Sequence, residues 1–138
     1  MADDDYIFRW LDFISTKISL VSEQTDFLSL LKKIILKIKN DMAQGNFIRA
    51  LISIGEQDAR LGISLYQRMV LNEDPDLLAY SSFPLGGAGK KQFDEVFEHV
   101  KEGLKSPNPI QKAASIKTLR VIFEVLTRLK MAMRFLIY

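Results

Sequence analysis

The residues that most often carry catalysis or bind metals are scarce in this sequence. His99 is the only histidine, and there is no cysteine. A Ser/His/Asp arrangement needs a histidine that a third group orients, and zinc sites draw most of their ligands from histidine and cysteine. His99 has Glu98 and Glu102 as neighbours in a segment with helical spacing, so we interpret it as an ordinary helix residue. We therefore expect no catalytic residue, no metal site, no cofactor and no enzymatic activity.

A glycine-rich stretch offers a second kind of chemistry, the binding of phosphate by backbone amides. Residues 83–91 read Phe-Pro-Leu-Gly-Gly-Ala-Gly-Lys-Lys. A nucleotide-binding loop needs GxxxxGK followed by Ser or Thr. Here Lys91 follows Gly89 and Lys90, and Pro84 stands where the first glycine is required. We expect a connecting loop between helices, with weak anion binding by the two lysines as the alternative.

Charge is distributed unevenly along the chain. The net charge is only +2, but the residues from Lys90 onward hold ten Lys and Arg against five Asp and Glu. Lys117, Arg120 and Arg128 share one stripe of the last predicted helix, and Glu124 interrupts it at pairing distance. A solvated face is one interpretation of this stripe, and a surface for an acidic partner, including nucleic acid, is the other.

Length and composition indicate one globular domain. A chain of 138 residues, 48% hydrophobic and 26% charged, can bury a core without disulfides or metals. The start, Met1 to Asp5, carries three aspartates and does not resemble a secretion signal. The most apolar segment, 119–138, carries too many charges for a membrane span. We expect a cytoplasmic protein made of a single domain, 1–138, with no membrane contact.

The elements that would position these residues are helical throughout. Apolar residues recur at spacings of three and four, and no segment alternates as a strand does. We expect Gly45 to interrupt the helical pattern, Gly55 to end a helix, and Pro84 to lie in a loop. The predicted helices cover about 5–18, 26–42, 46–54, 56–71, 75–82, 92–105 and 109 to near the end.

A weak internal repeat relates two of the predicted turns. Residues 74–81 align with residues 108–115, at a spacing of 34 residues, and each segment has proline, alanine and serine at matching positions. Each unit is a helix, a short turn containing proline, and a second helix. Such pairs cannot bury both of their apolar sides alone, so neighbouring pairs must cover them.

Residues 93–124 resemble a HEAT repeat. Pro109 matches the proline of the inter-helix turn in that family, Ala113, Ala114 and Leu119 match the small and leucine positions that pack between pairs, and Lys112 matches the basic position. The preceding unit, from Glu56 to Leu85, lacks the basic residue and contains Pro84, and the first 45 residues lack the motif. The resemblance implies an all-α fold of about six to seven helices, stacked as antiparallel pairs in a short α-solenoid, with a generic helical bundle as the alternative.

The resemblance also implies a function in binding or scaffolding, without enzymatic activity. We expect a protein partner on the second helices, and nucleic-acid binding is the alternative function. The predicted partner surface consists of Gln111, Lys112, Ser115 and Thr118, with Lys117, Arg120 and Arg128 beside it.

The last predicted helix carries a broad apolar arc with no evident polar cap. Either the N-terminal helices cover this arc or it is an interface between copies of the chain or with a partner. The predicted oligomer interface consists of Val125, Leu129, Met133 and Leu136.

Overall fold

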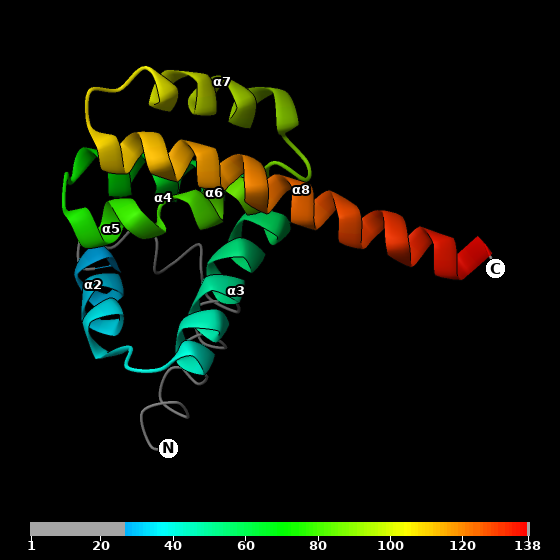
Figure 1. Cartoon of the computed structure of the whole chain (residues 1–138), viewed down its shortest axis with the longest axis horizontal. Helices are drawn as coiled ribbons and strands as arrows, with labels where there is room; N and C mark the ends of the chain where they lie inside the picture. Colours follow the sequence, from blue (N-terminus) through cyan, green and yellow to red (C-terminus); the bar gives the residue numbers. More distant parts are fainter. Residues whose placement is uncertain (1–26, 138) are drawn as a thin grey trace.

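The computed structural model describes the backbone of residues 27–137 and the side chains of that range except Leu129 and 131–137. This part of the chain is all helical and contains no strand, which confirms the predicted fold class. The predicted helix at 5–18 lies outside the described residues. The helices, shown in Figure 1, are α2 (Phe27–Lys37), α3 (Asp41–Gln57), α4 (Ala59–Leu71), α5 (Pro75–Tyr80), α6 (Ser82–Ala88), α7 (Phe93–Leu104) and α8 (Pro109–Ile137).

The predicted loop at residues 83–89 is instead helix α6, the most deeply buried element described. Every residue of α6 is buried, and the helix packs against α3, α4 and α8. Pro84 is the third residue of α6, within the first turn, where backbone N–H groups have no partner inside the helix. Burial removes water from the backbone, so the segment must satisfy its own hydrogen bonds, and a helix does so.

Glycines allow α6 to pack directly on the backbone of α3. A Cβ atom on Gly55 would lie 2.5 Å from the backbone nitrogen of Ala88, and one on Gly87 would overlap the carbonyl oxygen of Ile52. Gly62 of α4 joins the same crossing, since its Cβ would lie 2.7 Å from the carbonyl oxygen of Pro84. The three glycines therefore permit a contact between helix backbones at the centre of the molecule.

The helix boundaries around α3 differ from those that the sequence predicted. Gly45 and Gly55 both lie inside α3 and do not break it. The breaks fall at two capping residues. The Asn40 side chain accepts a hydrogen bond from the Ala43 amide at 2.8 Å, and Asp58 accepts one from the Leu61 amide at 3.2 Å. Caps satisfy amides that a helix start leaves unpaired, and this local bonding sets the boundaries.

The two predicted inter-helix turns are confirmed. Pro75 and Pro109 are the first residues of α5 and α8. Before them, Asp74 accepts a hydrogen bond from the Asp76 amide, and Asn108 accepts one from the Ile110 amide, both at 2.9 Å. The turns therefore share one capping chemistry. Membership of the HEAT-repeat family and the solenoid arrangement remain predictions.

Two groups of buried side chains form the core. The larger group lies mainly among α2, α3 and α5, includes Phe27, Phe47 and Leu77, and also draws side chains from α4 and α6. The smaller lies among α4, α6, α7 and α8 and includes Leu85 and Val96. Val121 and Val125 of α8 belong to the larger group and Ile122 to the smaller, so α8 contributes to both groups. None of the described helices combines the length and the apolar character needed to cross a membrane.

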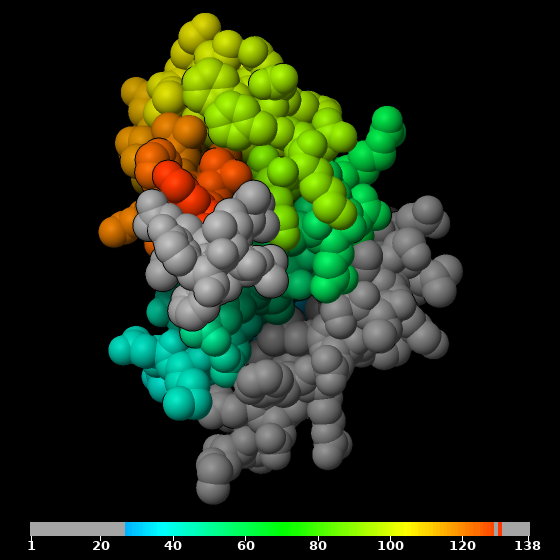
Figure 2. Space-filling view, turned by 90° about the vertical axis from the view of Figure 1, so that its right-hand side faces the viewer, coloured from blue at the N-terminus to red at the C-terminus, as the bar shows by residue number. Residues whose placement is uncertain are grey.

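Helices α7 and α8 form an antiparallel hairpin on the outside of this body, and the C-terminal end of α8 extends beyond the other helices (Figure 1). Figure 2 shows α7, in yellow-green, directly against α8, in orange, on one side of the molecule. The hairpin therefore has an inner side, which faces the core, and an outer side.

Candidate functional site

Helix α8 presents apolar side chains on two different sides. Its inner side is ordinary, because Val121 and Ile122 are both less than 5% exposed. On the outer side Phe123 is 75% exposed and Ile116 is 61% exposed, and Leu119 beside them is half-buried. At about 100° per residue these three side chains fall within an arc of roughly 60°. They form a continuous apolar stripe where polar residues are usual on an outer helix.

Helix α7 divides its apolar residues in the same way. Val96 and Val100 are fully buried against the body. Helical spacing alone predicts Phe93, Phe97 and Leu104 on the same buried face, but these residues are 46%, 38% and 41% exposed. The predicted buried face was therefore too wide, because the body contacts only one narrow side of α7. The rings of Phe93 and Phe97 stack on each other with centroids 5.8 Å apart.

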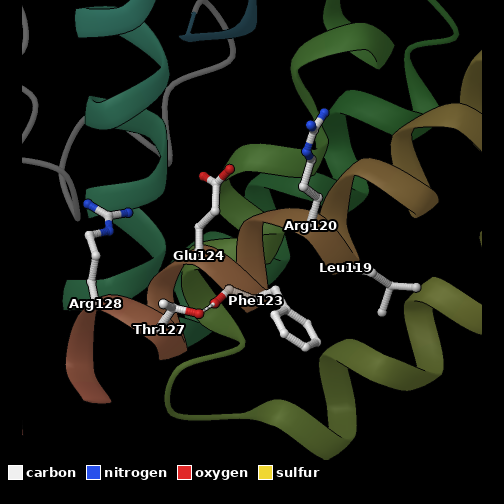
Figure 3. Close-up of a pocket in the computed structure, with 6 residues that line it drawn as sticks. All are labelled: Leu119, Arg120, Phe123, Glu124, Thr127 and Arg128. Carbon is white, nitrogen blue, oxygen red and sulfur yellow. Dashed lines mark hydrogen bonds between the residues drawn. The ribbon is translucent and has the colours of Figure 1, made fainter. Parts of the chain in front are cut away.

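The apolar residues of α7 and α8 lie on the same outer side of the hairpin. His99 contacts Tyr66 of α4 on one flank of α7, with ring centroids 5.7 Å apart. The three exposed apolar residues of α7 lie about 120–160° around the helix from His99, hence on the other flank. Figure 3 shows Leu119 and Phe123 projecting from α8 on the side where α7 lies. We call the combined set the hairpin surface: Phe93, Phe97, Leu104, Ile116, Leu119 and Phe123.

Beside the hairpin surface, α8 is hollowed. An open hollow of about 710 Å³ is lined by Leu119, Arg120, Phe123, Glu124, Thr127 and Arg128 (Figure 3). Pockets for small molecules have volumes of about 300–1,000 Å³, but they enclose most of their ligand. The described walls of this hollow come from one helix and leave it open. It therefore suits side chains of another protein better than an enclosed small molecule.

The two long edges of the hairpin surface carry opposite charge. Helix α7 has four exposed acidic residues, Asp94, Glu95, Glu98 and Glu102, and one lysine, a formal net charge of −3. Helix α8 has three exposed basic residues along its other side, Lys117, Arg120 and Arg128, with the acidic Glu124 among them, a net of +2. Figure 3 shows Arg120, Glu124 and Arg128 projecting from α8 on the side opposite Leu119 and Phe123. The acidic edge therefore belongs to α7, and the basic edge belongs to α8.

Three of the charged residues already have contacts within the chain. The Lys101 ammonium lies 2.7 Å from the Glu98 carboxylate and 5.4 Å from the centre of the Phe97 ring. The Lys117 ammonium lies 5.7 Å from the centre of the Phe83 ring. The Lys101–Glu98 pair is at the surface, so it is worth little by itself. The Lys117 side chain is exposed, although the Phe83 ring that its ammonium faces is buried.

Some residues predicted to bind a partner are buried. Ser115 is 3% exposed and Thr118 is fully buried, so the prediction for these two is wrong. Thr118 donates a hydrogen bond to the Ala114 carbonyl at 2.8 Å. Ser115 packs against Gly103, where a Cβ atom would lie 3.1 Å from that of Ser115. Small polar side chains occupy these places because α7 approaches α8 closely.

The other predicted residues of this surface divide into two groups. Lys112, Lys117, Arg120 and Arg128 are exposed, as a partner surface requires. Gln111 is half-buried, and its side-chain oxygen accepts a hydrogen bond from the Ser106 hydroxyl at 2.8 Å. Ala113, predicted to pack between helix pairs, is exposed, while its neighbour Ala114 is buried.

Gln111 also contacts Tyr66 of α4. Burial raises the pKa of the Tyr66 phenol, and the hydrogen bond from Gln111 and the charge of Glu102 modify that shift in opposite directions. The neutral phenol is therefore the form that the fold favours. Gln111 ties the turn before α8 to α4, which is a structural role.

Of the four residues of the predicted oligomer interface, the structure describes the side chain of Val125 only. Val125 is 4% exposed and belongs to the core, so it cannot be part of an interface, and this prediction is wrong. The side chains of Leu129, Met133 and Leu136 lie outside the described set. The physical reason at Val125 is that α3 and α5 of the same chain contribute to the core group that covers this side of α8.

The described residues hold no group of three or more His, Cys, Asp or Glu side chains placed to bind a metal ion. His99 is half-buried against Tyr66. The backbone amides of the glycine-rich segment up to Ala88 lie in buried α6, and those of Gly89, Lys90 and Lys91 donate to carbonyl groups of α6. These amides therefore do not form the open phosphate-binding loop that the glycines suggest. Comparisons with protein families, characterised proteins and solved structures found no match to this chain.

Sequence reasoning missed most of the hairpin surface. The available signal was at Ile116 and Phe123, which fall on the charged side of the α8 pattern and not on its apolar arc. An apolar residue among charges is common on surfaces and carries little information alone. Its meaning here comes from three further exposed apolar residues on α7, which only the packed hairpin brings to the same side.

Proposed function

We propose that this chain is a non-enzymatic protein–protein interaction module, acting in the cytoplasm, and that the hairpin surface is where a protein partner docks. The exposure of Phe123, at 75%, beside Ile116, at 61%, carries this proposal. Burying a side chain of this size is worth about 1.5–3 kcal/mol. A partner that covers the surface gains this free energy, and contiguous exposed apolar surface with a polar rim is typical of interaction sites.

Site-specific cross-linking tests this proposal. A photo-reactive phenylalanine analogue at position 123 should form covalent adducts with a polypeptide in cells, identified by mass spectrometry. The matched control is position 71, because Leu71 is 81% exposed but lies at the end of α4, outside the hairpin surface. Introducing Ile116→Glu into the position-123 protein should remove the adducts. Equal labelling at positions 123 and 71, or adducts that survive Ile116→Glu, would contradict a specific docking surface.

Nucleic-acid binding is the second candidate, and the exposed basic edge of α8 favours it. Lys117, Arg120 and Arg128 lie along one helix, but Glu124 lies among them and reduces the local positive potential. Binding through such contacts weakens steeply with salt, because each neutralised phosphate releases counterions. A duplex mobility-shift experiment at low and moderate salt tests it. A shift that Arg120→Glu abolishes would support this candidate, and no shift at low salt would remove it.

A further inference from the structure

We propose that the occupant of the hairpin surface is a second copy of this chain, placed so that α7 of each copy lies across from α8 of the other. This inference rests on the proposed function, because it names the partner of the same surface. It would give a symmetric dimer with a four-helix interface made of two α7 and two α8 helices. Closed two-fold dimers are the commonest assemblies of identical chains.

The charge of the two edges selects this arrangement. The surface has an apolar centre, an acidic edge on α7 with net charge −3 and a basic edge on α8 with net charge +2. Two identical surfaces can face each other about a two-fold axis that lies in the interface. If the axis is perpendicular to the helices, acidic edges meet each other and basic edges meet each other. If the axis is parallel to the helices, each acidic edge meets a basic edge, and this orientation is electrostatically favoured.

The apolar centre is compatible with the same arrangement. Rotation about the parallel axis brings the stacked Phe93 and Phe97 of one copy over the Ile116 and Phe123 side of the other. Aromatic side chains in the centre of a patch with a charged rim are the usual composition of protein interfaces. Each copy thus carries an acidic edge, a basic edge and an apolar centre, so two copies complement each other. A partner of a different sequence would need matching edges of its own.

The size of the surface sets the expected strength. Each helix is about 10 Å wide, α7 spans about 18 Å and twenty residues of α8 span about 30 Å, so each copy would bury roughly 500 Å². The total of about 1,000 Å² is the least that a specific interface usually needs. We therefore expect a concentration-dependent equilibrium between monomer and dimer.

Charge reversal on separate edges tests the arrangement. The first variant carries Lys117→Glu and Arg120→Glu, so both of its edges are acidic. The second carries Asp94→Lys and Glu98→Lys, so both of its edges are basic. Each variant alone should repel its own copies and sediment as a monomer, with dimer affinity reduced at least tenfold. An equimolar mixture should recover the dimer mass, because acidic edges then meet basic edges in both contacts.

The matched control reverses two exposed charges elsewhere, Arg49→Glu on α3 and Arg60→Glu on α4, and should dimerise as the wild type does. Circular dichroism verifies that every variant is folded. A wild-type monomer at about 100 μM, a concentration at which a dimer with a dissociation constant of that order or lower would be well populated, would overturn the inference. A mixture that remains monomeric would also overturn it. Adducts at position 123 with a different protein, together with a monomeric wild type, would show that a second copy is not the occupant. The hairpin surface would then still be a docking surface, for that other protein.

Discussion

Ser82, at the start of α6, has a buried hydroxyl without a hydrogen-bond partner. Its neighbour Ser81 is also buried, but the Ser81 hydroxyl donates a hydrogen bond to the Leu78 carbonyl at 2.7 Å. The two serines therefore have opposite roles at the junction of α5 and α6. A buried polar group without a partner costs about 1–3 kcal/mol, whereas a satisfied one contributes about 1 kcal/mol.

The paired serine substitutions test this difference. Ser82→Ala should raise the free energy of unfolding by about 1 kcal/mol, because it removes an unsatisfied hydroxyl. Ser81→Ala should lower it by about 1 kcal/mol, because it removes a hydrogen bond that stabilises the junction. Urea denaturation followed by circular dichroism measures both changes. A loss of stability in Ser82→Ala as large as that in Ser81→Ala would show that Ser82 has a hydrogen-bond partner in solution.

Asp74 links α2 to α5 and makes folding sensitive to acid. The Lys32 ammonium donates a hydrogen bond to the Asp74 carboxylate, which lowers the pKa of Asp74 and raises that of Lys32. Because the Asp74 pKa is lower in the folded chain than in the unfolded chain, the unfolded chain takes up the proton first as pH falls. The stabilisation is therefore complete above the unfolded pKa of about 4 and is lost as pH falls through the folded pKa.

Asp74→Asn isolates this charge effect, because asparagine can still cap α5 through its side-chain oxygen. We expect the variant to lose stability near neutral pH and to approach the wild type near pH 3, below the unfolded pKa of about 4, where the charge contribution is being lost. Denaturant titrations at both pH values provide the measurement. Adding Lys32→Gln to Asp74→Asn should change little at either pH. An equal loss at both pH values would assign the effect to capping and not to charge.

Among the elements, α6 depends most on its neighbours. Seven residues with a proline and two glycines would not form a stable helix alone, because helix nucleation is costly and short helices are marginal in water. Helices α3, α4 and α8 surround it, and the glycines of the crossing allow their backbones to approach. The stability of α6 is therefore a property of the crossing between helices.

Glycine substitutions within one helix test the crossing with α3. Gly55→Ala should destabilise the fold by about 2 kcal/mol or more, since the new methyl group meets the backbone of α6 and overpacked cores lose about 1–3 kcal/mol. Gly45→Ala is the matched control in the same helix, where a Cβ atom meets nothing within 4 Å. It should stabilise the fold by about 0.5–1 kcal/mol through helix propensity. Thermal unfolding that ranks the two variants in the opposite order would contradict the close crossing.

At the scale of the whole molecule, the outer side of the α7–α8 hairpin is not needed for folding. Phe123→Gln should change the free energy of unfolding by less than about 0.5 kcal/mol in dilute solution, because the ring is mostly in water before and after unfolding. Val96→Ala, on the fully buried side of α7, should cost about 2 kcal/mol. Denaturation of both variants at low protein concentration makes the comparison. A large loss in Phe123→Gln would mean that the ring supports the fold itself.

Local features of the sequence determined the helical class and the best-defined elements. The Asp-Pro and Asn-Pro turns placed the starts of α5 and α8 at Pro75 and Pro109. The spacing of apolar residues placed α7 to within a residue at each end. These predictions succeeded because capping hydrogen bonds and the fixed backbone angle of proline act between residues a few positions apart.

The tertiary structure alone decided what each face of these helices meets. It turned the predicted glycine loop into the buried α6, placed Gly55 inside a helix crossing, buried Thr118 and Val125, and left Phe123 exposed. Periodicity indicates that a side chain lies on an apolar or polar stripe, but not how wide the covered part of that stripe is. The width of the covered part depends on which distant helices pack against the stripe. The free energy of burial, summed over the whole core, determines that packing.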